Sequence, residues 1–377
     1  MARAENDRRT RRRRRNGLVA FGNALLSIVV LGMLAAGGVV WFGYQQYSAE
    51  GPAEADTAFI VDKNSGLGSV AERLQSQNLI TNSFVFSMAG RVLKKSGDLK
   101  PGQFIIPAKA SMSEVMDVLT ETKPVEFFVT VPEGETSFRA AERVRLASNS
   151  LTGEITTDPA EGTILPGRYD WTLPTETRQS VLDQMQAAMT KKLADVWAAR
   201  DKSIDDVVKT PEELLTLASL VERETSLASE RTMVASVFIN RLRKGMRLQT
   251  DPSVLYGVTL GKTVLNRGPT TKELRAETPY NTYIIKGLPP GPIANPGAET
   301  LEATAHPDTT TFLYFVAKTD DPKDGHYFSS TYAEHKRNVV KYRQAVKEAL
   351  AEDAAEAAAA KEALEAEQAQ AAGDTTE

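Results

Sequence analysis

The 377-residue sequence contains no cysteine and only three histidines, and these absences exclude several kinds of site. Without cysteine there are no disulfide bonds, no zinc–thiolate centres, no thiol nucleophile and no acylated cysteine to anchor the chain to lipid. The histidines, His306, His326 and His335, are too few and too scattered to predict a metal cluster. We therefore expect neither a metal nor a cofactor.

The net charge of the middle of the chain is small. Residues 1–15 carry eight arginines against Glu5 and Asp7, a net charge of +6, and residues 348–377 carry nine acids against Lys361, a net charge of −8. Since the whole chain has a formal charge of −4, the residues between these two ends sum to about −2. A nearly neutral middle gives no indication of nucleic-acid binding.

An uncharged apolar stretch, Gly17 to Tyr44, follows the arginines. As a helix it would exceed the roughly 30 Å of a bilayer's hydrocarbon core, so it predicts one transmembrane helix. A cleaved signal peptide has a shorter apolar core, and only Ser48-Ala49-Glu50 favours cleavage. The positive-inside rule places residues 1–16 in the cytoplasm, which predicts a single-pass protein of the inner membrane with a periplasmic or extracytoplasmic body.

The exported part is predicted to have an α+β fold. Residues 45–56 are small and polar and form a linker, and residues 57–123 show the order strand, helix, helix, strand, helix, with Ser69, Asn82 and Ser111 as helix N-caps. This small α+β module is LysM-like in element order only, and a packing domain without a ligand would show the same pattern. Residues 124–345 form a larger α+β domain, in which residues 165–169 are predicted to be a loop. Residues 346–377 form an Ala/Glu-rich acidic tail.

Residues 210–226 show the clearest local pattern, a capped helix with one apolar stripe. Thr210 is the predicted N-cap, Pro211 suits the first helical position, and Glu213 completes a capping box. Glu222 and Glu224 fall on opposite flanks of the stripe, so at most one of them can be the catalytic acid.

Periodicity does not choose between these two glutamates. Glu224 lies in the predicted last turn, where the helix dipole opposes a carboxylate, and it is partly buried beside Leu217 and Leu220. Both effects raise its expected pKa, which favours it slightly as a general acid.

Ser229 is the predicted N-cap of the next helix. The polar, aromatic and Pro/Gly-rich segments that follow, residues 246–257, 277–283 and 287–293, suit the walls of a sugar-binding groove.

The segment LASLVERETSLASERTMVASVFINRLRKGMRLQTDPSVLYG, with the later ETPYNTY, GLPPGPIANPG, AHP and FLYFVAK, closely resembles the membrane-anchored endolytic murein transglycosylases of the YceG-like family. The resemblance implies a lyase that cuts the bond between N-acetylmuramic acid and N-acetylglucosamine within peptidoglycan glycan strands, leaves 1,6-anhydro ends and limits the length of nascent strands. It implies that Glu224 is the catalytic acid. The expected substrate contacts are Gln249, Thr250, Asp251, Tyr256, Tyr280, Asn281 and Tyr283.

The partners expected from this resemblance are the glycan strands, the lipid bilayer, and peptidoglycan synthases or division proteins. One loop departs from the family, because its E-G-aromatic-x-x-P-D-T-Y element is replaced here by Glu161-Gly162 leading to Leu165–Tyr169. Two other functions stay open. One is a muramidase that hydrolyses the same bond, for which Asp251 could fold in as a second carboxylate, and the other is a non-catalytic wall-binding or division scaffold.

Overall fold

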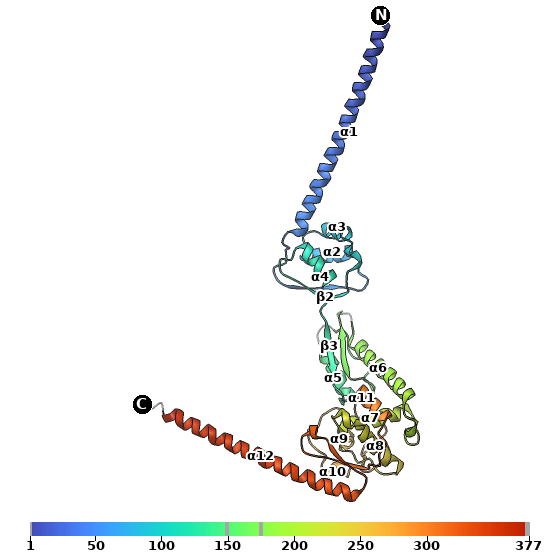
Figure 1. Ribbon diagram of the computed structural model, residues 1–377, viewed down its shortest axis with the longest axis vertical. Coiled ribbons are helices and arrows are strands. Elements are labelled where there is room, and N and C mark those ends of the chain that lie inside the picture. The colour runs from blue at the N-terminus through green and yellow to red at the C-terminus, as the bar shows by residue number, and fades with distance from the viewer. Residues whose placement is uncertain (1, 148–150, 173–175, 374–377) are drawn as a thin grey trace. The chain divides into compact units, whose positions relative to one another are not determined.

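The computed structural model describes the backbone of residues 2–147, 151–172 and 176–373, and the side chains of residues 25–147, 151–172 and 176–361. The chain divides into two compact units, Met1–Phe127 with Trp171–Pro174, and Phe128–Asp170 with Thr175–Glu377. Both contain helices and strands, which confirms the α+β class (Figure 1). Side chains of the arginine-rich residues 1–16 lie outside the described residues.

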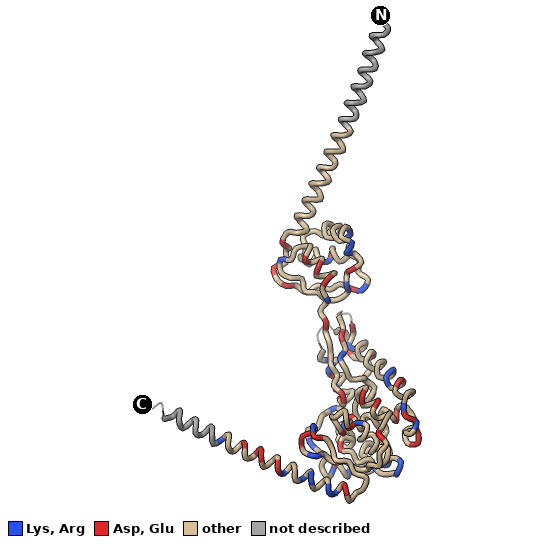
Figure 2. The backbone as a smooth tube through the Cα atoms, viewed as in Figure 1, with Lys and Arg blue, Asp and Glu red and all other residues tan. Residues whose placement is uncertain are grey.

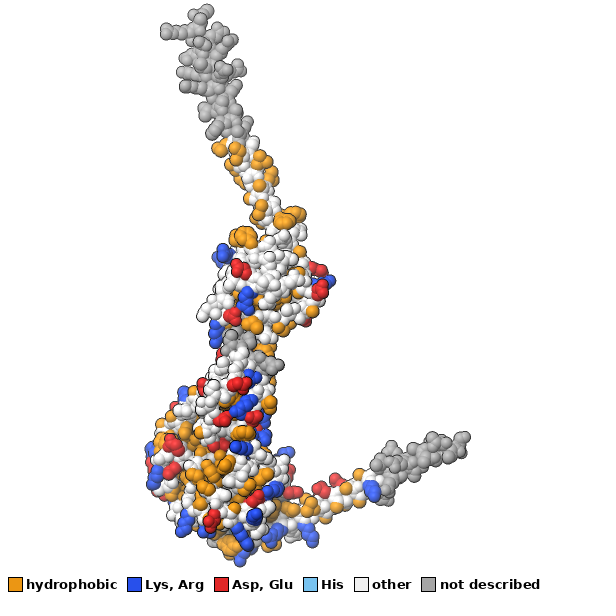
Figure 3. Space-filling view, turned by 180° about the vertical axis from the view of Figure 1, so that it is seen from behind, with side chains coloured by type: hydrophobic (Ala, Val, Ile, Leu, Met, Phe, Trp, Pro, Cys, Tyr) orange, Lys and Arg blue, Asp and Glu red, His pale blue; other side chains and the backbone are white. Residues whose placement is uncertain are grey.

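The first unit begins with α1 (Ala2–Ser48). Its segment Leu25–Ser48 has 24 residues and is long and apolar enough to cross a membrane. Figure 3 shows no charged side chain on this segment. The segment overlaps the predicted span, whose residues 17–24 have no described side chains. At the end of the helix, Tyr47 is buried in the core of the small module.

The small module has the predicted element order. It consists of β1 (Thr57–Val61), α2 (Leu67–Ser76), α3 (Ser83–Val92), a 3-10 turn (Lys95–Gly97), β2 (Gly102–Ile106) and α4 (Met112–Glu121). The two strands pair antiparallel, with Thr57 opposite Ile106. They enclose one core with the helices, and its largest buried side chains include Phe59, Phe86, Phe104, Leu74 and Met116.

Two of the three predicted helix caps in this module are confirmed. The side chain of Asn82 accepts from two backbone N–H groups, and Ser111 and Glu114 form a reciprocal capping box. Ser69 is not an N-cap, because α2 begins earlier, after Gly66, and the Ser69 hydroxyl donates to the Gly66 carbonyl at 2.8 Å. The true cap is a glycine without a side-chain acceptor, so the sequence pattern favoured the nearby serine.

The second unit opens with a two-stranded sheet of β3 (Phe127–Val131) and β4 (Gly167–Trp171), with α5 (Ser137–Leu146) between the strands in sequence. The β4 strand corrects the prediction of a loop at residues 165–169. A Pro-Gly pair suggested the loop, but the following tyrosine and tryptophan favour a strand.

The rest of this unit is a helical body with one β-hairpin. The hairpin is formed by β5 (Tyr314–Ala317) and β6 (His326–Ser329), and α12 (Tyr332–Gly373) follows it. Figure 2 shows that α12 changes from basic residues in its first turns to acidic residues further along. The other helices are α6 (Arg178–Ala199), α7 (Pro211–Glu224), α8 (Arg231–Arg243), α9 (Asp251–Thr259), α10 (Thr271–Leu274) and α11 (Ala298–Ala305), and 3-10 turns cover Lys202–Ile204, Ala228–Glu230 and Pro322–Asp324.

Helix α7 is the centre of the body. Residues Leu214–Val221 are all buried, because α6, α8 and α11 pack against it. The Thr210 hydroxyl accepts from the N–H of Glu213 and Pro211 begins the helix, as predicted. The Glu213 carboxylate, however, accepts from the N–H of Lys209 and not of Thr210, so the predicted capping box does not form.

Helix α8 begins differently from its prediction. Ser229 lies in the 3-10 turn Ala228–Glu230, and the helix starts at Arg231 without a side-chain cap. The Glu230 carboxylate accepts instead from the backbone N–H of His326 and contacts its Nδ1 at 2.7 Å. This partner is distant in sequence, so the local pattern around Ser229 does not reveal it.

Candidate active site

Glu224 is the last residue of α7, which confirms its predicted position in the last turn. Thr225 has an extended backbone (φ −140°, ψ 135°), and its hydroxyl accepts from the N–H of Leu227. The chain therefore leaves the helix directly after Glu224. Because the helix dipole places partial negative charge at this end, it disfavours the charged form of the carboxyl group.

The surroundings of Glu224 raise its pKa to about 7. Burial is the main cause, because the carboxylate loses hydration that the neutral acid does not need. The Thr250 hydroxyl opposes this rise, the negative charge of Asp251 adds to it, and the guanidinium groups of Arg241 and Arg223 oppose it. The side chain keeps some exposure to solvent. Near neutral pH the carboxyl group is about half protonated, as a general acid requires.

Glu222 has different neighbours. Its Oε2 accepts from the N–H of Gly297 at 2.9 Å. Its charge acts on Glu133, whose pKa is raised by burial first and by Glu222 second. The two glutamates therefore lie on different sides of α7, in agreement with the helical wheel, and Glu222 holds the loop that precedes α11.

The segment before α9 lies against the loop that contains Thr282. The N–H groups of Gln249 and Thr250 donate to the carbonyl and the hydroxyl of Thr282, at 3.2 and 2.9 Å. Gln249 has a positive φ of 49° and an exposed side chain, whereas Thr250 is buried. Within the described part of the chain the Thr250 hydroxyl has no hydrogen-bond partner of normal geometry, yet it lies close enough to lower the pKa of Glu224.

Asp251 begins α9 and connects it to the same loop. The Tyr283 hydroxyl donates to Oδ1 of Asp251 at 2.6 Å. Burial raises the pKa of Tyr283, and Asp251 raises it further, so this hydroxyl stays protonated. The structure thus brings three of the predicted contact residues, Thr250, Asp251 and Tyr283, to the end of α7 at Glu224.

Asn281 lies in this loop but faces the interior. It is fully buried, its Nδ2 donates to the carbonyls of Glu273, Leu274 and Ala276, and its Oδ1 accepts from the N–H of Tyr283. The side chain has no polar group left for a substrate, which corrects the expected direct contact to a role in holding the loop. A sequence motif does not distinguish an asparagine that binds a sugar from one that folds a loop.

Tyr256 and Tyr280 form an edge-to-face pair, with 4.7 Å between ring centroids. Glu161 lies beside them, because its charge raises the pKa of both tyrosines after burial, the main cause. The Glu161 carboxylate accepts from the N–H groups of Ser137 and Gly162, at 2.7 and 3.3 Å. The loop that departs from the family pattern therefore still places a carboxyl group next to two predicted contact residues.

Arg241 of α8 is a buried cation that the sequence analysis did not assign to the site. Its Nε and Nη1 donate to the carbonyls of Leu313 and Leu248, at 2.6 and 2.7 Å. Its guanidinium lies 5.5 Å from the ring centroid of Tyr314 and acts electrostatically on Glu224. In sequence it is one of several basic residues at a helix end, a pattern that indicates only compensation of the helix dipole.

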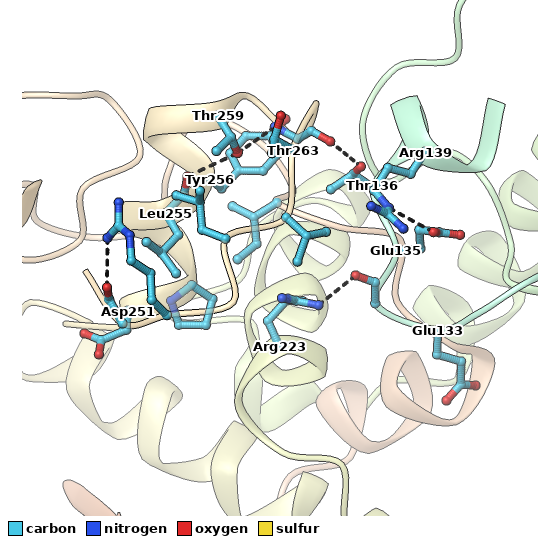
Figure 4. Close-up of a pocket in the computed structure, with 18 residues that line it drawn as sticks. Glu133, Glu135, Thr136, Arg139, Arg223, Asp251, Leu255, Tyr256, Thr259 and Thr263 are labelled. Carbon is cyan, nitrogen blue, oxygen red and sulfur yellow. Dashed lines mark hydrogen bonds and ion pairs between the residues drawn. The ribbon is translucent and has the colours of Figure 1, made fainter. Parts of the chain in front are cut away.

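A pocket of about 340 Å³ is lined by Arg223 and Asp251, whose charges act on Glu224, although Glu224 itself does not line it. Figure 4 shows Arg223 between two walls, one formed by α9 and one by the start of α5 and the turn before it. The labelled wall residues are Leu255, Tyr256 and Thr259 on α9 and Glu135, Thr136 and Arg139 opposite.

Among the described residues, no group of three or more His, Asp or Glu side chains is placed to hold a metal ion.

The sequence pattern of the YceG-like family matches residues 59–341. The chain belongs to the YceG-like family. This YceG-like region contains Glu224 and every predicted contact residue.

Two relatives are named endolytic murein transglycosylase. The protein of Streptococcus pneumoniae is 27% identical over 84% of this chain and 64% of its own length, and that of Bacillus subtilis is 38% identical over 49% of this chain and 48% of its own length. This chain thus spans slightly less than two thirds of the first relative and slightly less than half of the second. A crystal structure of a YceG-like protein from Listeria monocytogenes is 26% identical and covers 76% of this chain and 99% of its own, with a TM-score of 0.47.

Proposed function

We propose that this protein is an endolytic lytic transglycosylase. It cuts the bond between N-acetylmuramic acid and N-acetylglucosamine within peptidoglycan strands, with Glu224 as both acid and base. The observation that carries this proposal is the environment of Glu224, a carboxyl group at a helix end whose pKa is raised to about 7, beside a pocket. Membership of the YceG-like family and the names of the two relatives support it.

One carboxyl group can perform both proton transfers of this reaction. Protonated Glu224 donates its proton to the glycosidic oxygen while the bond from that oxygen to C1 of the muramic acid breaks. The carboxylate then accepts the proton of the C6 hydroxyl, whose oxygen bonds to C1 and closes the 1,6-anhydro ring. Glu224 ends protonated and no water is consumed. A pKa near 7 suits both steps, because the group must release and accept a proton at similar cost.

The neighbours of Glu224 favour different protonation states of its carboxyl group, and each of these states is needed in one of the two steps. The charge of Asp251 favours the protonated acid that begins the reaction. The buried positive charge of Arg241 favours the carboxylate that forms after the first transfer, when positive charge also develops on the sugar. The Thr250 hydroxyl, which has no other partner of normal geometry in the described structure, is placed to orient the carboxyl group.

A muramidase that hydrolyses the same bond is the alternative, and one observation favours it. Asp251 lies close enough to Glu224 to raise its pKa, so a second carboxylate is available for the paired-carboxylate mechanism of most glycoside hydrolases. Its Oδ1, however, already accepts a 2.6 Å hydrogen bond from Tyr283, which makes it a weaker base or nucleophile.

Product analysis separates these functions. The purified full-length protein in detergent is incubated with peptidoglycan glycan strands, and the fragments are identified by mass spectrometry. We expect 1,6-anhydro ends on fragments released from within strands. Reducing ends that incorporate labelled water would identify a muramidase. No fragments at all would identify a non-catalytic wall-binding or division scaffold and would reject both enzymatic readings.

We also propose that α1 anchors the protein in the inner membrane, with residues 1–16 in the cytoplasm and the chain after about residue 48 in the periplasm or extracytoplasmic space. The length and composition of Leu25–Ser48 support the anchor, and the arginine run before it supports the orientation. An anchored enzyme would reach strands soon after their synthesis, so it would limit the length of nascent strands. Peptidoglycan synthases or division proteins are its expected partners.

The small module of residues 57–123 is proposed to be LysM-like. Its strand-helix-helix-strand-helix order supports this assignment. A LysM-like module would hold the glycan strand while the second unit cuts it.

A further inference from the structure

The pocket beside Glu224 is lined by three acidic side chains, and each has a partner within the protein. Two of them form salt bridges with arginines, whereas the third, Asp251, accepts from a neutral hydroxyl and keeps its negative charge. The pairs are Glu135 with Arg139 and Arg143, at 3.0 and 2.5 Å, Glu133 with Arg231, at 3.2 Å, and Asp251 with the hydroxyl of Tyr283, at 2.6 Å.

Arg223 is the exception among the three arginines of the lining. Its Nη1 donates to the Gly134 carbonyl at 3.1 Å, and no carboxylate of the described residues forms a salt bridge with its guanidinium. Arg267, by contrast, is paired with both carboxylate oxygens of Glu273. Arg139 shares Glu135 with a second arginine. Among the described residues, the pocket thus presents an arginine that forms no salt bridge, one residue away from Glu224 in sequence.

The remaining lining combines aliphatic side chains with the hydroxyl groups of three threonines and Tyr256. Leu255 of α9 and Ile293 line the pocket together with Val264, which is 46% exposed. The threonine and tyrosine hydroxyls suit a sugar ring, whereas a guanidinium next to aliphatic side chains suits a group that is both charged and apolar. A carboxylate on a short aliphatic group matches both features, because guanidinium and carboxylate form strong paired hydrogen bonds.

One part of a glycan strand carries such a group. The lactyl ether of N-acetylmuramic acid has a methyl group and ends in a carboxylate, or continues into a short peptide that has its own carboxylates. N-acetylglucosamine carries neither. The substituent lies on the sugar next to the bond that Glu224 would cut, and Arg223 lies next to Glu224.

Building on the proposed function, we propose that this pocket receives the acyl substituent of N-acetylmuramic acid and that Arg223 binds its carboxylate, with Arg139 beside it. The pocket would then distinguish the two alternating sugars of the strand. It would place a muramic acid, and not a glucosamine, on the side of the bond where the anhydro ring must form. A hydrogen bond between charged groups is stronger than one between neutral groups, so its loss should weaken binding about tenfold.

The test measures binding in the Glu224→Gln background, where no strand is cut. The full-length protein in detergent is titrated with three strands of equal length. The first carries its peptides, the second has its peptides removed and exposes the lactyl carboxylate, and the third has that carboxylate converted to a neutral methylamide. We expect the charged strands to bind about tenfold more tightly than the neutral one.

Arg223→Met keeps the aliphatic stem and removes the charge, and it should bring this ratio close to one. Because Arg223→Met also removes the hydrogen bond to the Gly134 carbonyl, the readout is the ratio between strands and not the absolute affinity. Arg275→Met, which removes an exposed arginine outside the pocket lining, should keep the ratio. Preference for the first strand alone assigns the carboxylate to the peptide, and preference for the second alone assigns it to the lactyl group.

Equal binding of all three strands by the unsubstituted pocket overturns the proposal. An unchanged ratio in Arg223→Met does so as well. Neither result bears on the reaction itself. The reaction is assessed in a separate experiment, by the products that the protein with Glu224 intact releases. If that protein cuts no strand while the ratio stands, the proposed function fails and the binding site remains.

Discussion

The Tyr283 hydroxyl donates a 2.6 Å hydrogen bond to Oδ1 of Asp251, and this contact joins the start of α9 to the loop beside Glu224. Asp251 thereby keeps a fixed negative charge near Glu224 and raises its pKa. Glu224 must be protonated to begin the proposed reaction. Activity should therefore fall as the pH rises through about 7.

We expect Asp251→Asn to shift this alkaline limb of the pH profile, the fall in activity with rising pH, to lower pH. Removing the negative charge favours the carboxylate form of Glu224, so the acid loses its proton earlier. The dependence of kcat/KM on pH measures the shift. Tyr283→Phe is the matched variant, because it breaks the same hydrogen bond and retains the charge, and its limb should not move to lower pH. An alkaline limb that is unchanged in Asp251→Asn would show that Asp251 does not control Glu224.

Asn281→Ala should destabilise the protein by about 2–4 kcal/mol. The substitution leaves three backbone carbonyls and one N–H without their partner in a fully buried position. Thermal unfolding followed by circular dichroism measures the loss. Tyr283→Phe, which removes one hydrogen bond, should cost only about 0.5–1.5 kcal/mol. Normal stability with a raised KM in Asn281→Ala would restore the direct substrate contact expected from its motif.

Features that depend on neighbours in sequence were predictable. The cap at Asn82, the capping box of Ser111, and the end of α7 at Glu224 all follow from residue types within one or two helical turns. The choice of Glu224 over Glu222 was only weakly favoured by position. Its main physical basis, burial among residues of other elements, becomes visible once the chain is folded.

Features that depend on tertiary partners were missed. Arg241 and Arg223 resemble ordinary basic residues near helix ends, and only the fold shows that one is buried and the other lacks a carboxylate partner in the described structure. Glu161 lies in a loop that departs from the family pattern, yet the fold brings it to Tyr256. Ser229 had the correct residue type for a cap, but Glu230 is held by His326 from a distant strand.

The raised pKa of Glu224 predicts a pH-dependent cost in stability. Its folded pKa of about 7 lies above the ordinary value of 4.5, so the folded state holds the proton more tightly than the unfolded state. The contribution of Glu224 to stability is therefore greatest below pH 4.5 and falls as the pH rises to about 7, by up to about 3 kcal/mol at 1.36 kcal/mol per pKa unit. Glu224→Gln should unfold at a higher temperature than the wild type at pH 8, and the difference should vanish at pH 4. Equal melting temperatures at pH 8 would contradict the raised pKa.

The topology proposal predicts the behaviour of reporter fusions. A reporter that is active only outside the cytoplasm should function when it is fused after residue 345, because the arginine run holds residues 1–16 inside. An N-terminal tag should remain on the full-length protein in the membrane fraction, because α1 is expected to stay uncleaved. A cytoplasm-only reporter that works at the same position would reverse the orientation, and loss of the tag would identify α1 as a signal peptide.

The proposed mechanism rests on Glu224, and the chain supplies a matched pair of substitutions to test it. Glu224→Gln keeps the shape of the side chain and removes the transferable proton, so we expect a folded protein whose kcat falls by about 10²–10⁴-fold or more. Glu222→Gln removes one charge from the same turn, yet its amide oxygen can still accept from the N–H of Gly297, so it should retain most of its activity. Release of 1,6-anhydro fragments measures both. If Glu222→Gln is inactive and Glu224→Gln is active, Glu222 is the catalytic acid. If both variants are fully active, the catalytic acid lies outside this helix.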